Sequence, residues 1–168
     1  DTAESGLSLA QAPTRSVFSS GNLPPSEPLR TDVFDLKSPA ETSSFAAFPE
    51  QICDASGRTW LLTFYARHIS ANDWQYVYVA TSEWGSVDTG LATLEFDDRG
   101  RLLNASPPMP LRLPLSDGSP GPLIDMPGGT PVEAGGDGVD WLTEIDGIEL
   151  PAQLQLQVTQ SAQQAFAR

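Results

Sequence analysis

The chain has 168 residues, enough for one domain of ordinary size with its own core. It carries 22 acidic and 9 basic residues, which gives a formal net charge of −13. Because nucleic acids and anionic membranes attract cationic side chains, this charge argues against both as partners. The 15 prolines and 14 glycines disfavour long helices and favour short strands joined by turns.

Cysteine content and hydropathy bear on where the protein works. Cys53 is the only cysteine, so no disulfide can form within the chain. This suits a cytosolic protein, or one exported by a route that does not use oxidative folding. There is no run of about 18 apolar residues, so we expect no membrane-spanning helix. The start at Asp1, without Met or a signal sequence, indicates a fragment of a longer protein.

The N-terminal part of the chain predicts little regular structure. Residues 1–20 are interpreted as an extended arm or linker, with one short strand around residues 15–19. We expect residues 21–168 to form a single β domain. Weak alternation of apolar and polar residues over 31–36 predicts another strand.

The strongest pattern lies between residues 44 and 83. Residues 54–57, Asp-Ala-Ser-Gly, predict a tight turn. Residues 59–67 then predict a central strand, covered on both sides because both of its faces are largely apolar. One face carries Trp60, Leu62, Phe64 and Ala66, and the other carries Thr59, Leu61, Thr63 and Tyr65. A turn at 70–73 and a strand at 74–80 complete a predicted β-hairpin.

Further short strands are predicted in the second half of the chain. Residues 91–96 and 101–103 flank the turn Asp97-Asp98-Arg99-Gly100 and predict a second hairpin. Leucines at 111, 113 and 115 alternate around Pro114, which predicts an edge strand. Residues 116–140 are rich in Gly, Pro and Asp, and predict a loop-rich excursion with room for one short hairpin.

Two closing strands complete the predicted fold. Residues 139–145 and 154–159 form these strands, the second with Leu154, Leu156 and Val158 inward and glutamines outward. The whole pattern predicts an all-β fold. We expect a β-sandwich or distorted β-barrel of roughly eight to ten mostly antiparallel strands, with long loops rich in Pro and Gly.

A catalytic or metal centre has few candidate residues. His68 is the only histidine, and a hydrolytic triad needs a nucleophile and an orienting acid beside it. No Gly-x-Ser-x-Gly motif lies nearby, and the position of His68 predicts a surface or hairpin-end role. A zinc site normally needs several His or Cys ligands. Lys37, the only lysine, does not belong to a phosphate-binding loop.

Carboxylates are plentiful, and their clusters are Asp97-Asp98, Glu144-Ile145-Asp146 and Asp137 with Asp140. A small acid-catalysed hydrolase would need two of them facing each other in a cleft. Asp and Gly at strand ends are also the residues from which turns are made. Residues 135–140 contain a fragment of the acidic, glycine-rich pattern of calcium loops, but no complete twelve-residue loop.

Four tryptophans raise the possibility of sugar binding, in which exposed rings stack on the ligand. Trp60 and Trp74 lie within strong strand patterns and are expected in the core, whereas Trp84 and Trp141 lie among turn residues and could be exposed. None of these candidates demands catalysis. We therefore predict no catalytic, cofactor-binding or metal-binding residues, and expect that the chain is not an enzyme.

Several segments, in order along the chain, resemble one known family. They are Ser20–Pro24, Val33–Asp35, Ile52–Phe64, Asn72–Val77, Leu94–Leu102, and Leu154–Gln160 followed by Phe166. This series resembles the central domain of the bacterial flagellar hook protein, which is inserted between the two inner halves of an axial chain. Related rod and hook-like axial proteins remain alternatives. The chain departs from the family in having Cys53 where a tyrosine is usual, and in a longer segment over 107–138.

The resemblance implies a structural function outside the cell. Hook subunits stack helically into a curved tube that passes motor torque to the filament, and domains of this kind form its outer layers. The expected partners are other copies of the same subunit, whereas the isolated domain is expected to be monomeric. The resemblance also implies export by the flagellar secretion apparatus without a cleaved signal peptide. The alternative is an extracellular carbohydrate-binding β-sandwich module.

Overall fold

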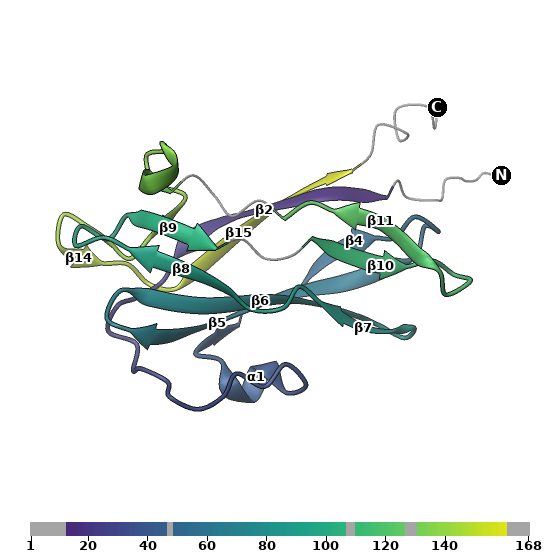
Figure 1. Ribbon diagram of the computed structural model, residues 1–168, viewed down its shortest axis with the longest axis horizontal. Coiled ribbons are helices and arrows are strands. Elements are labelled where there is room, and N and C mark those ends of the chain that lie inside the picture. The colour runs from purple at the N-terminus through teal and green to yellow at the C-terminus, as the bar shows by residue number, and fades with distance from the viewer. Residues whose placement is uncertain (1–12, 47–48, 107–109, 127–130, 161–168) are drawn as a thin grey trace.

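The computed structural model describes residues 13–46, 49–106, 110–126 and 131–160. The predicted all-β fold is confirmed: these residues form fourteen strands, ten of them with four residues or more, and two short helices (Figure 1). The elements in chain order are β2 (Thr14–Asn22), α1 (Pro39–Thr42), β3 (Phe45–Ala46), β4 (Glu50–Cys53), β5 (Thr59–Ser70), β6 (Asp73–Ser82), β7 (Gly85–Asp88), β8 (Ala92–Phe96), β9 (Leu102–Ser106), β10 (Leu111–Pro114), β11 (Pro120–Ile124), η1 (Val132–Ala134), β12 (Trp141–Leu142), β13 (Glu144–Ile145), β14 (Ile148–Glu149) and β15 (Gln153–Gln160).

The largest sheet is built on the predicted hairpin of β5 and β6. The two strands pair from Leu61 opposite Thr81 to Ser70 opposite Asp73, so only two residues form the turn between them. β3 and β4 pair with the edge of β5 that faces away from β6. β7 and β8 pair with the edge of β6 that faces away from β5. β9 pairs with β8, which completes the second predicted hairpin and a seven-stranded sheet.

The second layer joins the first and last strands of the domain. β2 and β15 pair antiparallel over their whole length, and β12 pairs with the other edge of β2. The hairpin of β10 and β11 continues this layer, because Asp125 bonds through its backbone to Arg15 and Val17. Residues 14–20, expected in an arm or linker with one short strand around 15–19, lie in this sheet as part of β2; residues 1–12 of that arm and Phe166 lie outside the described residues.

Both layers bury apolar side chains against each other, which makes the fold a sandwich; the described strands form no closed barrel. Of the two apolar faces of β5, the inward one carries Trp60, Leu62, Phe64 and Ala66, which are all fully buried. Phe64 lies at the centre of an aromatic cluster, with ring centroids 5.3 to 5.5 Å from Tyr76, Tyr78 and Trp141. Burial of such large rings contributes most of the hydrophobic stabilisation of this core.

The excursion over 116–140 contributes to this core as well as to loops. It contains β11, which pairs with β10, a strand that lies before the excursion, so the short hairpin is only half within this segment. Ile124 and Met126 are buried in the main core, although the segment has no core of its own. η1 and the loops around it complete the described part of the excursion.

The outer face of the β5–β6 hairpin is covered only in part. Phe34 packs there against Val77 and Val79, while Leu61, at 43% exposure, faces solvent. The expectation that both faces of β5 are covered is therefore wrong at Leu61. The strand predicted over 31–36 is also wrong, because this segment crosses the sheet face on the side that carries α1 (Figure 1) instead of pairing at an edge.

Arg67 holds this crossing segment in place. Its guanidinium donates to the backbone carbonyl oxygens of Asp32 and Thr42 and lies 5.0 Å from the centre of the Phe34 ring. These two backbone carbonyl oxygens accept hydrogen bonds from the Arg67 side chain, so they are satisfied without pairing to a neighbouring strand. The apparent alternation of residues 31–36 thus reflects one buried residue, Phe34, beside an exposed one, Val33.

Two turns of the large sheet share one design, Asp-x-x-Gly-Arg. In each turn, one carboxylate oxygen of the Asp accepts bonds from two backbone N–H groups, and the other oxygen accepts from the Arg Nε, for Asp54 at 2.8 Å and for Asp97 at 3.2 Å. The Asp54 carboxylate also accepts a bond from the Trp60 indole at 3.0 Å. The Gly has positive φ in both turns, which this residue adopts without steric cost.

These bonds change the acidity of both turn carboxyls. Burial alone would raise the pKa of Asp54, but the bonds from Trp60 and Arg58 outweigh it and lower the pKa below its usual value. Burial likewise opposes ionisation of Asp97, and the bonds from the backbone of Arg101 and Arg99 and from the Arg101 side chain lower its pKa. Both turns are therefore stabilised by the charged form of their Asp.

Replacing Phe34 tests the cluster on the outer face. Phe34→Ala should lower the free energy of unfolding by about 3 kcal/mol, because a buried aromatic ring is lost. Val33→Ala is the matched control; with Val33 at 82% exposure, it should change stability by less than about 0.5 kcal/mol. Urea unfolding followed by tryptophan fluorescence measures both values. Equal effects of the two substitutions would contradict the assignment of Phe34 to a packed cluster.

The lowered pKa of Asp54 predicts a pH dependence of stability. A carboxyl with a lower pKa in the folded state stabilises the fold above its unfolded pKa, and this contribution is lost as the pH falls below about 4. Asp54→Asn should lower the free energy of unfolding at pH 7 by about 2 kcal/mol. The free energy of unfolding of this variant should also decrease less steeply between pH 5 and 2 than that of the wild type. Urea unfolding at pH 7 and across that range measures both effects. Asp98→Asn, at an exposed position of the equivalent turn, should leave both the stability and the slope unchanged.

Candidate functional site

His68 is buried at the end of the β5–β6 hairpin. Its ring stacks on Trp74 at a centroid distance of 4.9 Å. Nδ1 lies 2.7 Å from the carbonyl oxygen of Glu27, and Nε2 lies 3.3 Å from that of Ala71. The predicted hairpin-end position is correct, whereas the surface position is not, since His68 is 3% exposed. With both ring nitrogens on backbone carbonyls, His68 fastens the loop at Glu27 to the large sheet.

The carboxylate clusters lie in or beside turns. Asp97 caps its own turn, while Asp137 accepts a bond from the backbone of Val139 at 3.2 Å, within the segment considered for calcium. Among the described residues, no group of three or more His, Cys, Asp or Glu side chains lies close enough to hold a metal ion. Asp97 and Asp137 thus have a local role in backbone geometry.

The four tryptophans divide differently from the prediction. Trp60 and Trp74 are in the core as expected, but Trp141 is also buried, at 2% exposure, because its ring packs in the main core against Phe64. Trp84 is the exposed one, at 44%. The Arg58 guanidinium lies 4.3 Å from the centre of the Trp84 ring and covers one of its faces. Of the two tryptophans considered for exposure, only Trp84 is therefore at the surface.

A groove lies on the open side of the sandwich, where β15 approaches β3 and β4. Its volume is about 360 Å³, and its lining is mainly apolar. We call it the β15 groove, and its lining residues are Phe45, Ala46, Glu50, Ala152, Gln153, Leu154 and Leu156. Leu154 and Leu156 point toward the core but are only partly buried, because no further element covers them in the described structure.

The edge of β15 adds unpaired backbone to this groove. Within the described part of the chain, β15 pairs with β2 on one side only, so the backbone groups on its other side are not used in a sheet. Natural edge strands are usually protected by charges, prolines or bulges. From Gln153 to Thr159 this strand carries only Gln, Leu, Val and Thr, with an irregular register only at its end.

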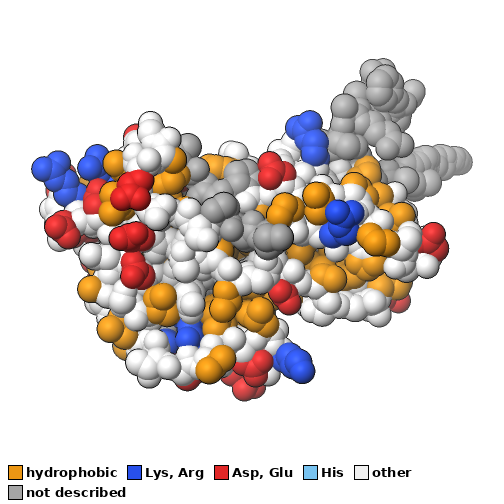
Figure 2. All heavy atoms as spheres, in the orientation of Figure 1, with side chains coloured by type: hydrophobic (Ala, Val, Ile, Leu, Met, Phe, Trp, Pro, Cys, Tyr) orange, Lys and Arg blue, Asp and Glu red, His pale blue; other side chains and the backbone are white. Residues whose placement is uncertain are grey.

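A second apolar surface lies at the tip of the hairpin formed by β13 and β14. Ile145 and Ile148 are paired across the hairpin and are exposed at 51% and 70%. Asp146 and Gly147 connect them, both with positive φ, as in a type I′ turn. We call this element the Ile145–Ile148 hairpin. Figure 2 shows charged side chains of both signs at the end of the molecule where Figure 1 places β14.

Neither apolar surface was recognised from the sequence. The groove joins residues about a hundred positions apart, and nothing local in either segment indicates that they meet. The hairpin carries a sequence signal that was read only as an acidic cluster: Ile-Asp-Gly-Ile, an Asp-Gly turn between two β-branched residues.

No family model matches the chain, and no curated protein sequence matches it. No helix in the described residues is long and apolar enough to cross a bilayer.

Proposed function

We propose that this domain is a structural, outer domain of a flagellar hook subunit or of a closely related axial protein. The observation that carries the proposal is the pairing of β2 with β15. Thr14 lies opposite Gln160 in this pair, so the chain enters and leaves the domain at one end. A domain inserted into a longer axial chain needs this arrangement, because its host must continue past it with little distortion.

The segments that resemble the hook family support the proposal by the local structure they adopt. The segments around Asp54 and Asp97 form the two capped turns, and the segment that begins at Asn72 opens β6. The last segment forms β15, the strand by which the chain leaves the domain. The resemblance thus lies in residues that set hairpin geometry.

The large sheet is suited to carrying load. β5 and β6 have 12 and 10 residues and pair along most of their length, with the aromatic cluster on one face and the Phe34 cluster on the other. Packed interiors have low compressibility, so such a block transmits force with little change of shape. The net charge of −13 keeps contacts between neighbours weak and screened by salt, and such contacts can break and re-form as a tube bends.

The proposal includes a location and partners. The domain would lie outside the cell in the flagellar hook, exported through the flagellar secretion apparatus without cleavage of a signal peptide. Its partners would be other copies of the same subunit in a helical assembly. The isolated domain would remain monomeric at ordinary concentrations and would have no catalytic activity.

Immunogold electron microscopy tests the location. Antibodies raised against the 168-residue domain should label the short hook segment between the cell body and the filament, in cells that carry the complete gene. Cells in which the gene is deleted should lose both the label and motility. Label confined to another surface structure, or unchanged motility after the deletion, would contradict the proposal.

The alternative, a carbohydrate-binding module, is favoured by one observation: Trp84 remains exposed while the other three tryptophans are buried. In that case Trp84→Ala should abolish binding on a glycan array, because a stacked ring is lost. Leu123→Ala, at another exposed apolar position, should leave binding intact. If the domain is a hook domain, neither the wild type nor these variants should bind any glycan on the array.

A further inference from the structure

Three Asp-Gly pairs lie in the described residues, and all three have the same intrinsic reactivity. They are Asp117-Gly118, Asp137-Gly138 and Asp146-Gly147. In such a pair the amide nitrogen of the Gly can attack Cγ of the Asp within the same chain, and the Gly has no side chain to shield its nitrogen. The three pairs differ in how the fold holds these two atoms.

In the first pair, both the carboxyl group and the nitrogen are held. The Asp117 carboxylate accepts bonds from the N–H and the hydroxyl of Ser119, at 2.9 and 2.5 Å, and the Gly118 N–H donates to the carbonyl oxygen of Leu115 at 2.9 Å. The bonds from Ser119 also lower the pKa of Asp117. Ring closure needs the neutral carboxyl group, whose hydroxyl leaves as water, so these bonds oppose it.

The second pair is packed against β9. The Asp137 carboxylate accepts a bond from the Val139 N–H at 3.2 Å, and the Gly138 carbonyl oxygen accepts one from the Leu102 N–H at 2.8 Å. A Cβ atom on Gly138 would lie only 2.6 Å from the carbonyl oxygen of Leu102. The backbone of this pair therefore has little room to rotate.

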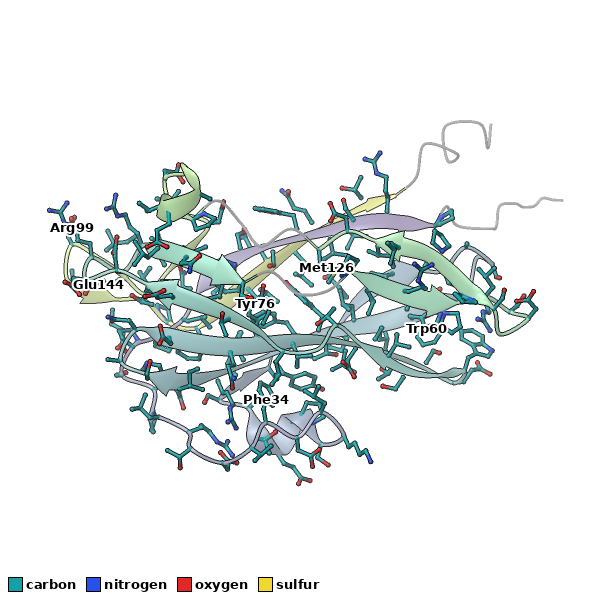
Figure 3. The ribbon with its side chains drawn as sticks, in the orientation of Figure 1. Phe34, Trp60, Tyr76, Arg99, Met126 and Glu144 are labelled. Carbon is teal, nitrogen blue, oxygen red and sulfur yellow. The ribbon has the colours of Figure 1, made fainter. Side chains whose placement is uncertain are left out.

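The third pair is free at both atoms. Asp146 and Gly147 form the exposed turn of the Ile145–Ile148 hairpin, and Figure 3 shows Glu144, the first residue of this hairpin, at the same end of the molecule as Arg99. Among the described residues, the Asp146 carboxylate accepts no hydrogen bond and the Gly147 N–H donates none. Open space surrounds Gly147, since a Cβ atom there would have no neighbour within 4 Å.

The hairpin that carries this pair can also open at little cost. It contains only two residue pairs, Glu144 with Glu149 and Ile145 with Ile148. Asp146 is the one non-Gly residue with positive φ, 51°, in the described part of the chain, and this conformation is unfavourable for a residue with a Cβ atom. Short, exposed elements open locally far more often than the core does.

We propose that Asp146 is a site of spontaneous isomerisation to isoaspartate. The Gly147 nitrogen forms a bond to Cγ of Asp146, and the carboxyl hydroxyl leaves with the amide proton as water, which gives a succinimide. Water then adds to one of the two ring carbonyls and breaks its bond to the nitrogen. One product is the original Asp, and the other is isoaspartate, whose main chain runs through Cβ and Cγ and is one carbon longer.

The longer main chain changes the hairpin. A type I′ turn connects its strands with two residues of fixed length, so an extra carbon at position 146 no longer places Ile145 opposite Ile148. It also displaces Glu149, whose carboxylate accepts bonds from the N–H and the hydroxyl of Ser26, at 2.8 and 2.7 Å. The inference goes beyond the proposed function and does not depend on it, because only water takes part.

Isotope labelling of the 168-residue chain tests the site. The protein is incubated at pH 7 in water enriched in the heavy oxygen isotope, because each round of ring closing and opening introduces one solvent oxygen. Mass spectrometry of proteolytic fragments measures the label at Asp117, Asp137 and Asp146. In urea the three should be labelled at comparable rates. In the folded domain the rates at Asp117 and Asp137 should fall by about tenfold or more, whereas the rate at Asp146 should stay near its value in urea.

Two results of this experiment would overturn the inference. One is protection of Asp146 in the folded domain equal to that of the other two residues. The other is faster labelling of Asp117 or Asp137 than of Asp146 in the folded domain.

Substitutions separate the chemistry from the effect of the fold. Asp146→Glu should remove the label at this position, because the ring would need one more member and closes slowly. Asp146→Asn should form isoaspartate faster than the wild type, because ammonia leaves more readily than water. Asp117→Asn is the matched control and should react more slowly than Asp146→Asn; equal rates in the two folded variants would contradict the role of the bonds at Asp117. Circular dichroism should show that each variant keeps its β structure.

Hydrogen exchange tests the consequence for the hairpin. The isoaspartate form, separated from the unmodified protein by chromatography, should exchange the amide proton of Ile148 faster. Exchange at Leu62, in the core, should be the same in both forms. An unchanged rate at Ile148 would contradict the disruption of the hairpin.

Discussion

Burial of the inner face of the β5–β6 hairpin beneath the β2–β15 sheet is the constraint on which the rest of the domain depends. Phe64 contacts Tyr76, Tyr78 and Trp141, so rings from both halves of the chain meet at one point. The sheet of β2, β12 and β15 covers these rings. The same pairing places Thr14 opposite Gln160, and in the described structure the β15 groove lies where β15 approaches β3 and β4.

The outer face of the large sheet is stabilised by different means. Residues 30–43 cover it without strand pairing, through one buried aromatic residue and the Arg67 guanidinium. The two capped turns and the His68 contacts likewise use side chains to satisfy backbone groups at the ends of strands. Polar side chains with fixed partners thus hold the periphery, while the aromatic core fixes the arrangement of the two layers.

The charge and the exposed apolar residues of the surface have opposite effects on association. Repulsion from a net charge of −13 opposes indiscriminate association, whereas the uncharged β15 and the exposed isoleucines provide places where association costs little.

The sequence by itself determined the elements whose signals are local. Strand patterns located the β5–β6 hairpin and β15, and the Asp-x-x-Gly turns located two strand connections, because these depend on residues a few positions apart. The tertiary structure alone decided what lies opposite each face. In the folded domain Trp141 is buried, residues 31–36 cross the face of the large sheet, and Leu61 is exposed to solvent. Phe45 and Leu154, which are far apart in the sequence, both line the β15 groove. Burial depends on which distant segments come to lie over a residue, and a local pattern carries no information about them.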